Sequence, residues 1–205
     1  MRVNVNDLNV DFLTASAHKF NGVKGTGFIY IKSGLTLTNM IFGGKQEHGK
    51  RGGTENVAGI VALSTALDES IAMITDGEGH RMNALAKATA SGLKSGIPVI
   101  KFNGNSAQRL PGILNVTFPD AYGESMMHLL DLKGICVSTG SAWYSGKDEP
   151  SHVLLAMGLS EQQAKSAIRI SYGRYNTEKD VNTIVTAICE TYKKTATTKV
   201  AERRQ

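Results

Sequence analysis

The residue type that stands out for chemistry is a lysine, Lys19, in the stretch SAHKFNGVKGTG at residues 16–27. Ser16 and His18 precede it closely, so a hydroxyl, an imidazole and an amine fall within four residues. A lysine amine becomes a nucleophile when it is partly desolvated and can release its proton. The cluster therefore predicts either a phosphate site with a reactive amine or, as for most short polar clusters, incidental surface polarity.

A second cluster, KRGGT at residues 50–54, precedes a predicted helix. Glycines permit close approach of a ligand to the backbone, a helix N-terminus offers unpaired N–H groups, and Thr54 adds a hydroxyl. These features together favour an anion site. The alternative is a capped helix start in which Thr54 serves only its own backbone.

A third candidate, Arg169, lies in the apolar stretch AIRISYG. An unpaired buried charge is costly, so the guanidinium needs a partner. Its planar fork suits a carboxylate ligand, and an internal ion pair to Asp or Glu is the alternative. The spacing of His and Cys suggests no metal site.

Apolar periodicity indicates the elements that must position these residues. Lys19 falls between two predicted strands, VDFLTASA and GFIYIK, and two helices follow the glycine-rich stretch. From residue 97 short strands alternate with helices, which indicates an α/β class. The expected strands there are IPVIKFNG, ILNVTF, ICVSTGSA and AIRISYG, and the expected helices are GESMMHLLDLKG, SHVLLAMG and a last helix from Asn176 or Thr177.

Composition describes an ordinary globular chain, with 205 residues, 41% hydrophobic and 20% charged. The net charge of +5 owes part of its excess to the basic C-terminus, and basic and aromatic residues do not alternate, so we expect no nucleic-acid partner. No signal-peptide pattern or run of eighteen apolar residues occurs, which predicts a cytoplasmic protein without a membrane partner. Cys136 and Cys189 lie in apolar segments and are expected to be buried.

Several long segments in order resemble the C-terminal half of the pyridoxal-phosphate-dependent cysteine desulfurases, in the class V aminotransferase group. The resemblance covers nearly the whole chain. It is carried by SAHKFNGVKGTGFIYIK, GGKQEHGKRGGTENVAGIVAL, ILNVTF, LDLKGICVSTGSA, EPSHVLLAMGLS and AIRISYGRYNTEKDV.

The resemblance implies roles for the candidate residues. Lys19 corresponds to the lysine that forms the Schiff base with pyridoxal 5'-phosphate, and Ser16 and His18 to contacts of the cofactor phosphate. Thr54 corresponds to the threonine that reaches the phosphate of the neighbouring subunit, which implies a homodimer. Arg169 corresponds to the arginine that binds the carboxylate of the substrate, L-cysteine. In the family a loop cysteine takes the substrate sulfur as a persulfide, leaves L-alanine, and passes the sulfur to an acceptor protein for iron-sulfur cluster or thio-cofactor assembly.

The resemblance also implies a fold, the fold type I of pyridoxal-phosphate-dependent transferases. We expect the end of the cofactor-binding large domain and a connecting helix at residues 1–75, a small α/β domain at 76–195, and a solvated tail at 196–205. The segments that hold the cofactor ring in the family have no counterpart here. We therefore expect a chain that is inactive alone, with the other half supplied by another chain or lost.

One substitution departs from the family pattern. The family's loop cysteine follows GSA, whereas this chain has Trp143 there, and indole has no nucleophilic sulfur. Two alternatives to a desulfurase thus remain open. One is a non-catalytic remnant or partner-binding subunit of the same fold, and the other is a pyridoxal-phosphate lyase or aminotransferase that lacks the sulfur-accepting step.

Overall fold

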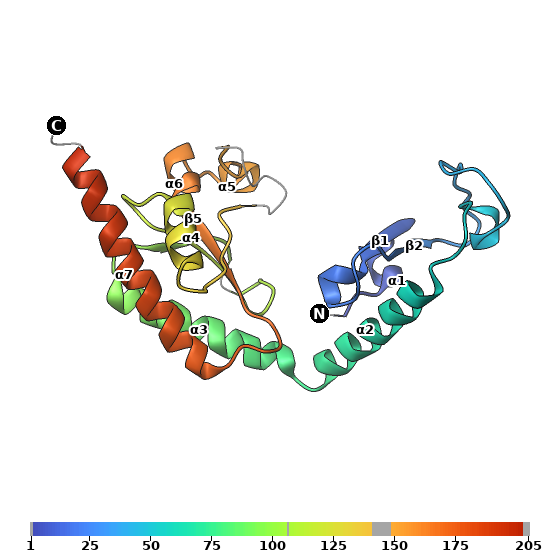
Figure 1. Cartoon of the computed structure of the whole chain (residues 1–205), viewed down its shortest axis with the longest axis horizontal. Coiled ribbons are helices and arrows are strands. Elements are labelled where there is room, and N and C mark those ends of the chain that lie inside the picture. Colours follow the sequence, from blue (N-terminus) through green and yellow to red (C-terminus); the bar gives the residue numbers. More distant parts are fainter. Residues whose placement is uncertain (1, 106, 141–148, 203–205) are drawn as a thin grey trace. The chain divides into compact units, whose positions relative to one another are not determined.

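The computed structural model of the chain describes residues 2–105, 107–140 and 149–202, with side chains through residue 196. The chain forms two compact units, Met1–Gly77 and Glu78–Gln205 (Figure 1). The sequence places the domain boundary after residue 75, where the long helix of the first unit ends.

The first unit begins with a short helix and a β-hairpin. Helix α1, Val5–Leu8, is capped by the Asn4 side chain, and strands β1, Phe12–Ser16, and β2, Gly27–Ile31, pair antiparallel. Between them the 3-10 helix η1, Ala17–Phe20, carries Lys19. The two strands expected on either side of Lys19 are therefore present, and they form one hairpin.

A long loop and helix α2, Val57–Thr75, complete the first unit. The loop contains one 3-10 turn, η2, Glu47–Gly49. Helix α2 begins after Asn56, whose side chain accepts from the Gly59 N–H at 3.1 Å. It lies along the hairpin (Figure 1), and the Ser70 hydroxyl donates to the Phe20 carbonyl at 3.3 Å.

The second unit is built on a three-stranded antiparallel sheet of order β3-β4-β5. Its strands are β3, Lys101–Phe102, β4, Ile113–Thr117, and β5, Ala167–Ser171. Because side chains alternate across a strand, Ile168 and Ile170 enter the core while Arg169 points to the other face. The Arg169 side chain therefore lies on the face of the sheet that points away from this core.

Two long helices, α3, Glu78–Gly96, and α7, Glu178–Glu202, pack closely within the second unit. The absence of side chains at Gly92 and Gly96 permits this packing. A Cβ at Gly92 would lie 3.0 Å from Val185 Cγ2, and one at Gly96 would lie 2.5 Å from Cys189 Sγ. The two glycines and their two partners are each four residues apart, so one stripe of α3 meets one stripe of α7.

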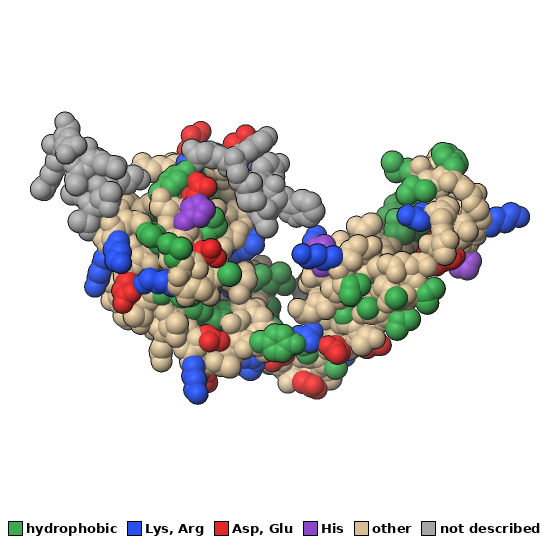
Figure 2. Space-filling view, in the orientation of Figure 1, with side chains coloured by type: hydrophobic (Ala, Val, Ile, Leu, Met, Phe, Trp, Pro, Cys, Tyr) green, Lys and Arg blue, Asp and Glu red, His purple; other side chains and the backbone are tan. Residues whose placement is uncertain are grey.

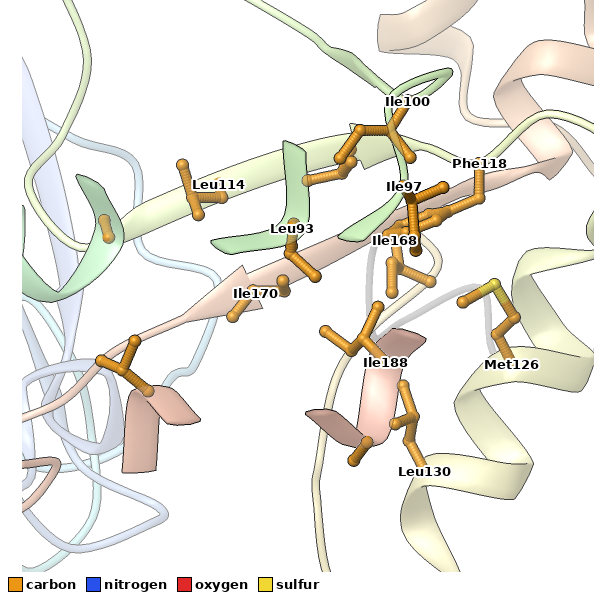
Figure 3. Packing of buried hydrophobic residues seen from close by; sticks show 14 of the residues in the cluster. Leu93, Ile97, Ile100, Leu114, Phe118, Met126, Leu130, Ile168, Ile170 and Ile188 are labelled. Carbon is orange, nitrogen blue, oxygen red and sulfur yellow. The ribbon is translucent and has the colours of Figure 1, made fainter. Parts of the chain in front are cut away.

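The core of the second unit lies between the sheet and the helices α3, α7 and α4, Gly123–Asp131 (Figure 3). Phe118 is fully buried there and its ring centroid lies 6.0 Å from that of Tyr192. A smaller cluster of Leu154, Ala164 and Ala167 holds α5, His152–Ala156, and α6, Glu161–Lys165, against the end of β5.

Three details differ from the expectations. The strand expected at 135–142 is reduced, in its described part, to a single bridge between Ser138 and Arg169, because the Ser138 hydroxyl turns to the Gly140 carbonyl and the chain leaves the sheet. Cys136 is exposed rather than buried, and Cys189 is half-buried. Helix α7 continues to Glu202, past the boundary expected at residue 195.

Candidate functional site

Lys19 lies on a turn that the hairpin holds at both ends. Ser16 is the last residue of β1, and the Ala17 N–H donates to the Thr26 carbonyl at 3.0 Å. Ala17 is fully buried, whereas His18 and Lys19 are exposed. The buried alanine thus anchors a turn that presents the imidazole and the amine to solvent.

The Ser16 side chain does not cap the helix that follows it, a role that serine often has. Ser16 stands at the N-cap position of η1, yet its side chain makes no capping hydrogen bond. Its backbone is extended, and it directly precedes the 3-10 helix that carries His18 and Lys19. Ser16, His18 and Lys19 thus lie on one short connection of the hairpin, and their roles stay predictions.

The turn is closed by Gly22, a residue that the sequence interpretation did not single out. The Gly22 N–H donates to the Ala17 carbonyl at 2.8 Å. A Cβ at Gly22 would lie 2.9 Å from the Ala17 Cβ, closer than real side chains approach. The packing of the turn against Ala17 therefore requires a glycine at position 22.

The loop that carries Lys50 to Thr54 is fixed by its own polar groups. The Gly52 N–H donates to the Ile41 carbonyl at 3.0 Å, and the Gly53 N–H donates to Gln46 Oε1 at 3.2 Å. Asn39 Nδ2 donates to the Gly49 carbonyl at 2.6 Å. The Gly52 and Gly53 amides therefore have hydrogen-bond partners within the loop, and the anion site at the start of α2 stays a prediction.

Thr54 does not cap helix α2, so the alternative interpretation of this residue, as a helix cap, is wrong. Asn56 takes the N-cap position, and Thr54 lies two residues earlier with an exposed side chain. An Asn directly before the apolar run was the available sequence signal for this cap. Thr54 remains a hydroxyl on an ordered, solvent-facing loop of the first unit.

Arg169 is half-buried in β5, between Asn115 of β4 and Ser138. Its backbone N–H donates to the Ser138 carbonyl at 2.6 Å and its carbonyl accepts from the Ser138 N–H at 3.1 Å. Within the described ranges its guanidinium forms no ion pair with Asp or Glu. The internal ion pair, which was the alternative to a ligand role, is therefore not found in that part of the chain.

A buried hydroxyl pair supports the end of the strand that carries Arg169. Tyr172 follows β5, and its hydroxyl lies 2.5 Å from Thr89 Oγ1 on α3. Burial raises the pKa of Tyr172, so the phenol stays protonated as a hydrogen-bonding group near neutral pH. The pair ties β5 to α3 across the core.

The loop after Tyr172 is held by Arg81 at the start of α3. Its guanidinium donates to the Arg174 carbonyl at 2.9 Å and to the Asn176 carbonyl, and Nε donates to Glu78 Oε2 at 2.9 Å. Hydrogen bonding to Arg81 lowers the pKa of Glu78. The positions of β5 and of the start of α7 are thus fixed on both sides of the loop.

Cys136 borders a shallow hollow of about 190 Å³, lined also by Met127, His128, Asp131 and Val137. The hollow lies beside α4. The described residues contain no group of three His, Cys, Asp or Glu side chains that could hold a metal ion. Trp143 lies outside the described residues.

The candidate residues are divided between the two units. Ser16, His18 and Lys19 share one turn of the first unit, and Thr54 lies on a loop of that unit. Arg169 belongs to the sheet of the second unit. Each unit fixes its own residues through hydrogen bonds and packing.

Comparisons with known proteins show which proteins this chain is similar to. The model of the family described as aminotransferase class-V matches residues 1–184. A curated relative, "Cysteine desulfurase IscS" of Clostridium botulinum, is 42% identical over 185 residues, which cover 89% of this chain and 46% of the relative. Another of the same name, from Methanosarcina thermophila, is 40% identical over 94% of this chain and 47% of the relative.

Solved structures give the same result for the fold. A NifS-like protein from Rickettsia africae superposes with a TM-score of 0.83 at 33% identity, covering 94% of this chain and 50% of that one. The α/β architecture and the expected fold type are confirmed by this likeness. The chain spans about half the length of the curated relatives it matches.

Proposed function

We propose, from the premise that this chain belongs to the aminotransferase class-V family, that it forms part of a pyridoxal-phosphate-dependent cysteine desulfurase. Enzymes of this type convert L-cysteine to L-alanine and transfer the sulfur through a loop cysteine, and this last step needs a thiol that the chain lacks at residue 143. The relatives named cysteine desulfurase, about 40% identical to the chain, support the proposal. The observation that carries the proposal is the exposed Lys19 amine on its hydrogen-bonded turn, preceded by Ser16, whose side chain makes no capping bond.

The residues of the turn fit pyridoxal 5'-phosphate. The Ser16 hydroxyl has no capping bond to lose, and the Lys19 amine is exposed to a ligand. We assign covalent attachment of the cofactor to Lys19 and contacts with its phosphate to Ser16 and His18. When bound, the cofactor supplies an electron sink for the carbanion formed at the substrate α-carbon.

The chain's own residues have separate tasks in this proposal. The Lys19 Nζ would take the proton from the substrate α-carbon and return one to the product. Arg169 orients the substrate through its carboxylate, to which the planar guanidinium can donate two parallel hydrogen bonds. Its half-buried position without an acidic partner in the described residues leaves the fork available for that ligand.

Partners follow from the same proposal. Thr54 is assigned to the cofactor phosphate of a second subunit, so we propose a homodimer, and its exposed position on an ordered loop is compatible with this role. A sulfur-acceptor protein, in iron-sulfur cluster or thio-cofactor assembly, would receive the product sulfur. Because relatives are about twice as long as this chain, the complete site also needs the portion that they have in addition.

A second candidate function rests on one sequence observation, Trp143 in place of the loop cysteine. A lyase or an aminotransferase uses the same lysine and the same carboxylate anchor but needs no sulfur-accepting thiol. The non-catalytic alternative predicts no covalent cofactor at Lys19. These candidates differ in products and in occupancy of Lys19, and both can be measured.

The test of the proposal is cofactor trapping. Purified chain is incubated with pyridoxal 5'-phosphate, alone and with the remaining portion of a relative, and is then reduced with borohydride, after which the label is mapped to a peptide. We expect label on Lys19, its loss in Lys19→Ala, and its retention in Lys24→Ala, a matched control because Lys24 is another exposed lysine of the same hairpin connection. Undiminished label in Lys19→Ala would reject the assignment.

A further inference from the structure

The face of the three-stranded sheet that points away from the core carries a row of polar side chains. Both neighbours of Asn115 in β4 are core residues, so Asn115 itself lies on the opposite face, which we call the outer face. Arg169 also lies on the outer face, directly across from Asn115 in the register of β4 and β5. The row continues to Asn103, beside β4, and to Ser138, at the single bridge.

Backbone hydrogen bonds show that Asn115 and Arg169 form the narrow type of antiparallel pair. In an antiparallel strand the N–H and the carbonyl of one residue point to the same neighbouring strand. The Asn115 carbonyl accepts from the Asn103 N–H at 2.9 Å and therefore points away from β5. Both backbone groups of Arg169 bond to Ser138, on the other side of β5. Side chains across such a pair approach closely, with Cβ atoms about 4.5–5.5 Å apart.

The amide of Asn115 is oriented by Asn103. The Asn103 Nδ2 donates to Asn115 Oδ1 at 2.6 Å and to Thr117 Oγ1 at 2.8 Å. Thr117 is only 3% exposed, so this end of the row is anchored within the sheet. Because Oδ1 of Asn115 is directed to Asn103, the Nδ2 on the other branch of the same planar amide is turned away from the β3 side.

Two donor groups of the outer face have no partner among the described residues. Asn115 Nδ2 makes no hydrogen bond there, although Oδ1 of the same amide does. The guanidinium of Arg169 forms neither an ion pair nor a hydrogen bond in that part of the chain. Both residues are half-buried, where donors without acceptors are costly. Two neighbouring donors of this kind fit one ligand with several acceptor oxygens.

We infer that Asn115 is a second donor to the substrate carboxylate, and that Asn103 is the residue that positions it. The inference rests on the proposed function, which assigns the same carboxylate to Arg169. A carboxylate offers about four lone-pair sites on its two oxygens, and a guanidinium fork uses two of them. The Asn115 Nδ2 can donate to a third, because its side chain starts beside that of Arg169.

A general attraction for anions does not explain the arrangement. On the face of the second unit that Figure 2 shows, the Lys and Arg side chains of the described residues are interspersed with Asp and Glu. Opposite charges spread in this way favour no particular anion. A carboxylate must therefore be selected by donors at fixed positions, which the outer face supplies.

The alternative is that Asn103, Asn115 and Thr117 only join β4 to the end of β3. That role uses Oδ1 of Asn115 as an acceptor and leaves its Nδ2 without a function. A substitution that keeps the acceptor and removes the donor therefore separates the two roles. It should preserve the strand pairing and weaken the binding of a carboxylate.

NMR titration of the full chain with L-alanine, the product named in the proposed function, tests the inference without any cofactor. L-alaninamide is the matched ligand control, since it has the same amine and methyl group but no carboxylate. We expect L-alanine to shift the resonances of the Asn115 side-chain NH2 and the Arg169 Nε–H. L-alaninamide should leave both resonances unchanged.

Matched variants test the donor itself. Asn115→Asp keeps an oxygen for Asn103 but replaces the donor by a negative charge, so binding of L-alanine should weaken by about tenfold or more. Asn182→Asp adds the same charge at an exposed position of α7, across the core from the outer face, and should bind as the parent does. Asn115→Val suits a strand, adds no charge and should weaken binding by about tenfold, the scale of one hydrogen bond to a charged group.

The positioning role of Asn103 has its own spectroscopic signature. In Asn103→Ala the amide of Asn115 loses the bond that orients it. The shift that L-alanine causes at the Asn115 NH2 should therefore shrink, while the shift at the Arg169 Nε–H remains. If Asn115→Val loses the dispersed spectrum of the folded chain, Asn115→Asp and Asn103→Ala still decide the question.

Three outcomes overturn the inference. Equal binding of L-alanine by the parent and by folded Asn115 variants would leave Asn115 only the task of joining the strands. Equal shifts with L-alanine and L-alaninamide would exclude recognition of the carboxylate, and no shift at either residue of the parent would exclude the site. The labelling of Lys19 is measured separately, so this inference can fail while Lys19 is labelled, or hold while Lys19 is not.

Discussion

Gly22 and Ala17 close the turn that carries Lys19: the Gly22 N–H donates to the Ala17 carbonyl at 2.8 Å, and the two residues leave no room for a second Cβ. Ala17 is fully buried under this contact. The position of the Lys19 amine is therefore set by a packing contact between two residues that have no chemistry of their own.

The first prediction concerns this contact. Gly22→Ala places a Cβ 2.9 Å from the Ala17 Cβ and should displace the turn, so labelling of Lys19 by pyridoxal 5'-phosphate and borohydride should fall at least tenfold. The control is Val23→Ala, which shortens a side chain that is 45% exposed in the same connection and should be labelled as the parent is. Normal labelling of Gly22→Ala would show that the turn tolerates the shift.

The second prediction concerns the buried hydroxyl pair. Thr89→Val removes the partner of the Tyr172 hydroxyl and should lower the free energy of unfolding of the second unit by about 1–3 kcal/mol, the cost of an unsatisfied buried polar group. The double variant Thr89→Val with Tyr172→Phe removes both hydroxyls and should lose less than the sum of the single variants. Urea denaturation followed by circular dichroism measures this, and simple additivity would contradict a direct bond.

The third prediction is a pH dependence at the start of α7. The Thr177 backbone N–H donates to the Asp180 carboxylate at 2.8 Å and, with the Asn176 side chain, lowers the pKa of Asp180 below its ordinary value of 3.8. A lowered folded-state pKa stabilises the fold above the unfolded-state value, and this contribution is lost as the pH falls through the folded-state value. Asp180→Asn should therefore speed exchange of the first α7 amides at pH 7.

Its control is a pH comparison. The difference between Asp180→Asn and the parent, expressed as a protection factor, should start to shrink as the pH falls below about 3.8 and should vanish below the lowered folded-state pKa, where the carboxyl is protonated in both folded and unfolded chains. Asp131→Asn, on an exposed aspartate at the end of α4, should leave α7 unchanged. A difference that is constant with pH would exclude the carboxylate as the cause.

The fourth prediction compares two leucines of the second unit. Leu93 is fully buried in the core and Leu132 is 83% exposed. Leu93→Ala should cost about 2–5 kcal/mol of unfolding free energy through lost burial and a residual cavity. Leu132→Ala should stay within about 0.5 kcal/mol of the parent. Similar urea midpoints for the two variants would argue against the packing described.

The fifth prediction concerns Trp143. In protein assembled with the remaining portion of a relative, the parent should not convert L-cysteine to L-alanine by a persulfide route, whereas Trp143→Cys should gain a persulfide at position 143, detected by mass spectrometry. The rival thiol is Cys136, which is exposed. Because Cys136 is exposed, burial does not prevent its thiol from reacting. Ser138, two residues later, is hydrogen-bonded to the Arg169 backbone, which restricts the movement of Cys136.

Cys136→Ser decides between the two thiols. The parent and Cys136→Ser should be equally inactive, and the double variant Trp143→Cys with Cys136→Ser should form alanine as Trp143→Cys does. If the parent already forms alanine and sulfide, and Cys136→Ser stops it, the exposed cysteine performs the reaction and the prediction for Trp143 is wrong.

The sequence by itself determined the elements whose periodicity is long or strongly apolar. The apolar spacing in helix α2 and the alternation in β2 and β5 led to correct predictions, because each depends on side chains within one segment. The motif around Lys19 and the order of the longer motifs also identified the family correctly. The cytoplasmic location and the homodimer stay predictions.

Only the tertiary structure decided which groups are hydrogen-bonded to each other and which face of each element is buried. The Gly53 N–H donates to Gln46, and Asn56 caps α2. In its described part, the segment that contains Cys136 pairs with the sheet through one bridge, between Ser138 and Arg169. These outcomes depend on partners distant in sequence, which local patterns do not specify.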